Sequence, residues 1–182
     1  MRKLWIHDTL ETNRCTLRIP TEDDVQSLWE LIDDDVSEFM DWEKWTNSDK
    51  MQEWIKRIRN NAQQKKSWYA SVFLKDHTCI WMFWIPQMNE ETENIEIWFW
   101  IGKKYWWNWY VPECFEALKK HAFHTLKVET MHLSVDSRNN NCKRVALKAW
   151  LSYDGTLKKW TKIKWNLINT QYYSLTKEEY FT

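Results

Sequence analysis

The most constraining feature of this chain is the stretch from Ile95 to Glu113, IEIWFWIGKKYWWNWYVPE. Apolar residues at every second position indicate a strand, and Pro112 predicts that a helix opens there, because its missing N–H is not needed in a first turn. A strand that leads through a short loop into a helix predicts an anion site, since the first N–H groups of a helix have no partner inside it. Such loops are usually rich in glycine, whereas this one reads Trp106-Trp107-Asn108-Trp109-Tyr110-Val111.

The composition makes this loop more unusual. The chain has 2 glycines and 16 tryptophans in 182 residues, whereas glycine usage averages about 7%. Its length fits one domain with a sizeable core, and a net charge of zero gives no general attraction to nucleic acid or to an anionic membrane. No apolar run predicts a signal peptide or a membrane span, and four cysteines without metal-type spacing suggest reduced thiols in a cytoplasmic protein.

Periodicity predicts the order β-α-α-β-β-β-α-β-α-β-β, which is an α/β (α+β) domain with a mixed, mostly antiparallel sheet flanked by helices. The expected strands are Cys15–Ile19, Trp68–Leu74, Cys79–Ile85, Ile95–Ile101, Met131–Val135, Leu157–Lys164 and Leu167–Leu175. The expected helices follow a cap at Thr21, begin near Ser48, run over Pro112–Leu126 and begin near Asn140.

Four segments in this order resemble the GNAT N-acetyltransferase family, and within it the ribosomal-protein (RimJ/RimL-like) branch. They are residues 11–24 (ETNRCTLR and TEDD), residues 96–113, residues 135–142 (VDSRNNNC), and YDGTL at 153–157 with the closing YSL at 173–175. The resemblance covers nearly the whole chain. It implies a single N-acetyltransferase domain over residues 11–180, with a short N-terminal extension over residues 1–10.

The resemblance implies an enzyme that transfers acetyl from acetyl-CoA to a primary amine, either of a protein N-terminus or of a small molecule, without a metal. The implied coenzyme A contacts are Phe99, Trp100, Ile101, Trp106, Trp107, Asn108, Trp109, Tyr110, Val111, Asn139 and Lys143. The loop and the helix N-terminus would hold the diphosphate, and the pantetheine arm would pair with the backbone near Phe99 like an added strand. No nucleic acid or membrane partner is expected, and the protein would be a monomer or a homodimer.

Two residues are candidates for catalysis. Glu96 would be the general base beside the thioester, although a strand carboxylate paired with a lysine is an equally good reading. Cys142 stands where the branch often has serine and could protonate the departing thiolate, although a small core residue explains it as well. Asn139 could bind the pantetheine arm or cap a helix. Ala146 occupies the position of the tyrosine that many relatives use as general acid.

The departures from the family pattern are systematic. Tryptophan stands where the family places glycine at Trp81, Trp84, Trp98, Trp107, Trp109, Trp150 and Trp165. One hypothesis is that UGA codons that encode glycine in the source organism were translated as tryptophan. The competing interpretation is a glycine-poor protein that has lost its ligand site and acts as a catalytically inactive binding module.

Two other patterns carry less weight. His121 and His124 could share a metal, but no third ligand is suggested and a surface pair is the simpler interpretation. Lysines at 158, 159, 162 and 164 alternate with tryptophans, as in a surface that stacks single-stranded nucleic acid. Alternating charges on an exposed hairpin account for the same pattern.

Overall fold

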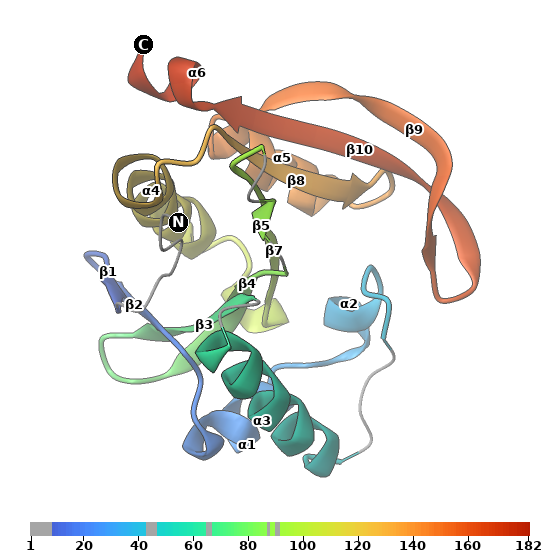
Figure 1. The fold of residues 1–182 in the computed structure, drawn as a ribbon. Coiled ribbons are helices and arrows are strands. Elements are labelled where there is room, and N and C mark those ends of the chain that lie inside the picture. Colours follow the sequence, from blue (N-terminus) through green and yellow to red (C-terminus); the bar gives the residue numbers. More distant parts are fainter. Residues whose placement is uncertain (1–8, 43–46, 65–66, 87, 90–91) are drawn as a thin grey trace.

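The computed structural model describes residues 9–42, 47–64, 67–86, 88–89 and 92–182 (Figure 1). Its strands are β1 (Leu10–Glu11), β2 (Cys15–Arg18), β3 (Trp68–Leu74), β4 (Cys79–Ile85), β5 (Met88–Asn89), β6 (Asn94–Glu96), β7 (Trp98–Ile101), β8 (Thr130–Asp136), β9 (Ser152–Ile163) and β10 (Asn166–Thr176). Its α-helices are α1 (Val25–Glu30), α2 (Asp34–Ser37), α3 (Asp49–Gln63), α4 (Tyr110–Lys120), α5 (Asn140–Lys148) and α6 (Lys177–Phe181). Short 3-10 helices cover Glu22–Asp24 and Lys103–Tyr105, and a π-helix over His121–Leu126 continues α4. Of the N-terminal extension expected over residues 1–10, residues 1–8 lie outside the described residues.

The strands form two five-stranded sheets with the orders β1-β2-β3-β4-β7 and β5-β6-β8-β10-β9. Every pairing is antiparallel except that of β6 with β8, which is parallel. The predicted α/β fold class with a mixed, mostly antiparallel sheet is therefore confirmed.

The two sheets separate at Ile97. The sequence predicted one strand over Ile95–Ile101, but β6 pairs with β8 in the second sheet while β7 pairs with β4 in the first. The Ile97 amide still donates to the His132 carbonyl at 2.9 Å, and beyond it the chain leaves β8. The apolar alternation continues through this point, so the pattern could not show that the chain changes sheets.

Helices cover both faces of the first sheet (Figure 1). Helices α1 and α3 pack on one face through a core cluster that includes Leu28, Met51, Ile55, Met82 and Trp100. Helix α4 fills the space between the two sheets, in a larger cluster that includes Leu17, Phe83, Ile95, Phe115, Leu118 and Leu133. The buried residues of α3 and α4 recur every three or four positions, so each of these helices turns one apolar face to the core.

The β9–β10 hairpin is longer than predicted and arches toward α2 (Figure 1). A two-residue turn, Lys164 and Trp165, joins its strands. The Lys164 amide donates to Asp41 Oδ1 at 3.3 Å, so the turn contacts the segment that follows α2.

Candidate functional site

A cleft of about 210 Å³ lies where the two sheets separate. Four parts of the chain line it, and the last of them, the α2 region, was not predicted from the sequence. They are β7 with Phe99, Trp100 and Ile101; the loop and start of α4 with Tyr105, Trp106, Trp107, Trp109, Tyr110, Val111 and Pro112; α5 and its cap with Asn139, Asn141, Cys142, Arg144, Val145 and Lys148; and the α2 region with Asp35, Val36, Phe39 and Met40.

Most of the predicted coenzyme A contacts line this cleft, but two do not. Asn108 donates from Nδ2 to the Trp106 carbonyl at 3.1 Å and stays within its own loop. Lys143 donates from Nζ to the Ser137 carbonyl at 3.0 Å, on the strand-to-helix connection. Arg144 and Lys148 line the cleft from α5 instead.

The loop reaches α4 through two left-handed residues. Trp107 has φ 67°, and Trp109, the N-cap residue of α4, has φ 62° and ψ 15°. Helix α4 then begins at Tyr110, so Pro112 is its third residue. The prediction that Pro112 is the first residue of this helix is wrong. Proline is tolerated at the third position because the first four N–H groups of a helix lack intrahelical partners.

The side chains of these two tryptophans are mostly exposed and lie against cations of α5. Trp107 is 71% exposed and Trp109 is 58% exposed. The Arg144 guanidinium carbon is 6.0 Å from the centre of the Trp107 ring, and Lys148 Nζ is 3.3 Å from the centre of the Trp109 ring. Each contact is a cation–π interaction, in which the indole ring covers a cation at the mouth of the cleft that could otherwise bind an anion.

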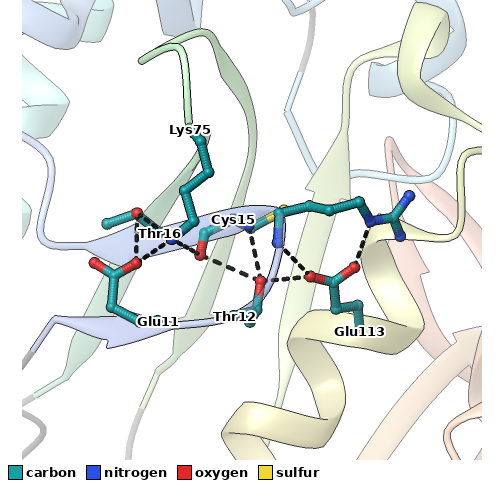
Figure 2. A network of polar contacts seen from close by, with 7 residues as sticks. Glu11, Thr12, Cys15, Thr16, Lys75 and Glu113 are labelled. Carbon is teal, nitrogen blue, oxygen red and sulfur yellow. Dashed lines mark hydrogen bonds and ion pairs between the residues drawn. The ribbon is translucent and has the colours of Figure 1, made fainter.

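A network of polar contacts joins the β1–β2 turn to the first turn of α4 (Figure 2). Glu113 accepts a hydrogen bond from Thr12 Oγ1 at 2.6 Å and from the Arg14 amide at 2.8 Å, and its other oxygen pairs with Arg14 Nε at 2.6 Å. Arg14 also donates to the Asn108 carbonyl at 3.0 Å, and so reaches the loop itself. Residues far apart in sequence thus fix the start of α4.

Burial and hydrogen bonding have opposite effects on the pKa of Glu113. Burial alone would raise the pKa of this carboxyl, but the hydrogen bonds from Thr12 and Arg14 outweigh burial and hold its pKa below the ordinary value. Glu113 therefore stays ionised at neutral pH.

The side chain of Asn139 caps α5, since its Oδ1 accepts from the Cys142 amide at 2.9 Å. The cap uses the side-chain oxygen, so the amide NH₂ is the part that can donate to a ligand in the cleft. Burial raises the pKa of the Cys142 thiol to about 12, which keeps the thiol neutral at physiological pH. The thiol can therefore donate a hydrogen bond, but it gives up its proton reluctantly.

Glu96, the predicted general base, ends β6 one residue before the sheets separate, and it is not among the described residues that line the cleft. Its carboxylate accepts a hydrogen bond from Ser134 Oγ at 2.6 Å. Burial, followed by the negative charge of Glu96, raises the pKa of the neighbouring Tyr172, so this hydroxyl stays protonated. Ser134 and Tyr172 were not predicted as site residues. The polar positions of the β8 alternation would have indicated Ser134.

The interpretation of His121 and His124 as a surface pair is wrong for His121, which is buried. His124 packs edge-on against Tyr180 and Phe181. Within the described ranges no group of three or more His, Cys, Asp or Glu could hold a metal, and no helix is long and apolar enough to cross a membrane. On the hairpin, Lys162 Nζ lies 4.5 Å from the centre of the Trp165 ring.

The helix N-terminus at the mouth of the cleft and the edge strand along it are the parts of a coenzyme A site that the sequence resemblance implied, whereas the separation of the two sheets was not predicted. Residues 14–149 match the acetyltransferase (GNAT) domain family. The match covers more than half of the chain, so the chain belongs to this family of acetyltransferases.

Individual relatives agree with this assignment. The chain is 23% identical over 175 residues to the uncharacterized N-acetyltransferase p20 of Bacillus licheniformis, covering 95% of this chain and 98% of that protein. A GNAT-family acetyltransferase from Bacillus anthracis has the same fold with a TM-score of 0.83 and 19% identity, covering 94% of this chain and all of that one. RimL, a ribosomal L7/L12 alpha-N-protein acetyltransferase solved with coenzyme A, superposes with a TM-score of 0.84 at 12% identity, covering 94% and 99% of the two chains.

Proposed function

We propose that this protein transfers an acetyl group from acetyl-CoA to a primary amine, either a protein N-terminus such as that of a ribosomal protein or the amine of a small molecule. The observation that carries the proposal is the cleft at the separation of β6 and β7. It has a helix N-terminus and two cations at one end, and Glu96 stands one residue before the separation.

The chain has the groups that such a substrate requires. β7 is an edge strand of the first sheet, so its backbone is placed to pair with an extended pantetheine arm along Phe99–Ile101. The N-terminus of α4 together with Arg144 and Lys148 suits the phosphates, because helix N–H groups and fixed cations favour anions. Acetyl-CoA would supply an already activated thioester, and alignment with the amine is then the main task of the protein.

Proton transfer is assigned to residues near the separation of the sheets. Glu96 would take the proton of the attacking amine, and its bond from Ser134 would fix the orientation of the carboxylate. Cys142 would face the leaving thiol as a hydrogen-bond donor. Asn139 would donate from its side-chain NH₂ to the pantetheine arm.

A catalytically inactive binding module is the second candidate, and one observation favours it. The Trp107 and Trp109 indoles lie against the two cations that the phosphates would need. In this case the fold would bind a partner without catalysis.

Thiol release from acetyl-CoA tests both candidates. The assay compares the protein as written with Trp107→Gly/Trp109→Gly, and uses a peptide with a free N-terminus, the same peptide with a blocked N-terminus, and a small aliphatic amine. Release that needs a free amine supports acetyl transfer, and the productive acceptor identifies the substrate class. A variant that binds acetyl-CoA yet releases no thiol with any acceptor would favour the binding module.

A further inference from the structure

Backbone conformation separates the tryptophans into two groups. Four of them have a positive φ: 67° at Trp107, 62° at Trp109, 64° at Trp150 and 70° at Trp165. No other tryptophan in the described part of the chain does. Positive φ is uncommon for any residue but glycine, and for a bulky side chain it is an outlier. All four belong to the seven positions at which the family pattern places glycine.

The end of α5 shows why position 150 favours glycine. The Leu151 amide donates to the Ala146 carbonyl and the Trp150 amide donates to the Leu147 carbonyl, both at 3.1 Å. This pair of bonds defines a Schellman motif, in which the left-handed residue just after the helix is usually glycine. The Trp150 side chain is 76% exposed, so little packing offsets the strain.

The β9–β10 turn also favours glycine, at position 165, because of its turn type. Its two residues, Lys164 and Trp165, have φ 46° and 70°, and Ile163 pairs with Asn166 across it. A two-residue hairpin with positive φ at both positions is a type I′ turn, which strongly favours glycine at its second position. Trp165 is 87% exposed.

The three remaining positions lie in strands. Trp81 is fully buried, and the indole N–H groups of Trp81 and Trp98 are buried without a hydrogen-bond partner among the described residues. Trp84 faces Trp98 across the β4–β7 pair, and their rings stack at 5.8 Å. A buried N–H without an acceptor is costly. By contrast the indole N–H of Trp106, which is not one of the seven positions, donates to the Ile101 carbonyl at 2.9 Å.

We propose that the native host makes this protein with glycine at all seven positions, because UGA codons specify glycine there. The positions are 81, 84, 98, 107, 109, 150 and 165. The proposal rests on backbone geometry at four positions, on buried donors at Trp81 and Trp98, and at Trp84 on the family pattern alone. It holds or fails independently of acetyl transfer. With glycine at these positions, the cofactor loop, the end of α5 and the hairpin turn adopt their positive φ angles without strain.

The gene and the native protein test the proposal directly. We expect UGA at the seven positions and UGG at Trp29 and Trp54, whose side chains pack against the core cluster of α1 and α3. The intact mass of the protein purified from its host should be lower by seven times the mass difference between tryptophan and glycine residues. UGG at the seven positions, a mixture of the two codons across both groups, or a native mass that fits tryptophan would each overturn the proposal.

A stability comparison tests the backbone argument in recombinant protein with the sequence as written. Trp165→Gly and Trp150→Gly should each raise the midpoint of thermal unfolding by about 2–4 °C, because strain is relieved while little packing is lost. Trp160→Gly is the matched control, since Trp160 is 64% exposed in the same hairpin but has no positive φ. This control should lower the midpoint, because glycine weakens a strand. If Trp165→Gly and Trp150→Gly lower it as well, these positions do not favour glycine.

Discussion

Replacing Trp107 and Trp109 by glycine should restore tight binding of acetyl-CoA. In the sequence as written, the loop holds two bulky residues at positive φ. Their indole rings form cation–π contacts with Arg144 and Lys148. Glycine adopts this backbone without strain and leaves both cations to meet phosphate. Calorimetric titration with acetyl-CoA measures the difference.

The magnitude follows from the contacts. A charge-assisted hydrogen bond contributes about 1.5–3 kcal/mol, so recovering two gives roughly 3–6 kcal/mol. Two cation–π contacts must be given up, each contributing about 0.5–1 kcal/mol at an exposed site. The net gain is about 1–5 kcal/mol, and since about 1.4 kcal/mol is a factor of ten, the dissociation constant should fall by roughly fivefold to several thousandfold.

Trp160→Gly is the control here too, because Trp160 is a tryptophan on an exposed strand that does not line the cleft. Its affinity for acetyl-CoA should equal that of the protein as written. Micromolar binding by the protein as written, or no gain in the double variant, would refute this account of the loop.

Three further outcomes are expected. In the double glycine variant, Glu96→Gln should lower kcat by about 10²–10⁴-fold with little change in acetyl-CoA affinity, as measured by steady-state kinetics and titration; weaker binding with unchanged turnover would assign Glu96 a structural role. In the same variant, Lys148→Gln should weaken acetyl-CoA binding by about tenfold or more at low salt, and less as salt rises; an affinity independent of this lysine would place the phosphates elsewhere. The folded pKa of Glu113 is lowered, so its stabilising effect is complete above the unfolded pKa of about 4.3 and is lost as the pH falls through the folded value. Thermal unfolding of Glu113→Gln should therefore lose stability less steeply below about pH 4 than the parent protein, and equal slopes would contradict the assignment.

Much of the fold could be predicted because its signals are local. The bounds of β3 and β4 match the prediction, and α3 begins directly after the predicted Ser48. Alternation and capping residues act over a few neighbours, so one sequence contains them. The break at Ile97 could not be predicted, because it depends on which strand lies beside each half of the segment.

The site was predicted unevenly for the same reason. The strand, the loop and α5 were found through motifs along the chain, and ten of their predicted residues line the cleft. The α2 region carries no motif that would place Phe39 or Met40 there. The contact between Arg14 and Glu113 joins residues 99 apart in the sequence, and no local pattern reports it.

The pairing of Arg14 with Glu113 has an electrostatic consequence for the nucleotide end of the cleft. Glu113 lies in the first turn of α4, and an uncompensated carboxylate there would repel a diphosphate that approaches the same helix end. Arg14 compensates it at 2.6 Å, and the Arg14 guanidinium also lies 4.6 Å from the centre of the Tyr110 ring. The carboxylate can therefore anchor the β1–β2 turn to α4 while the partial positive charge of the helix end remains available to an anion.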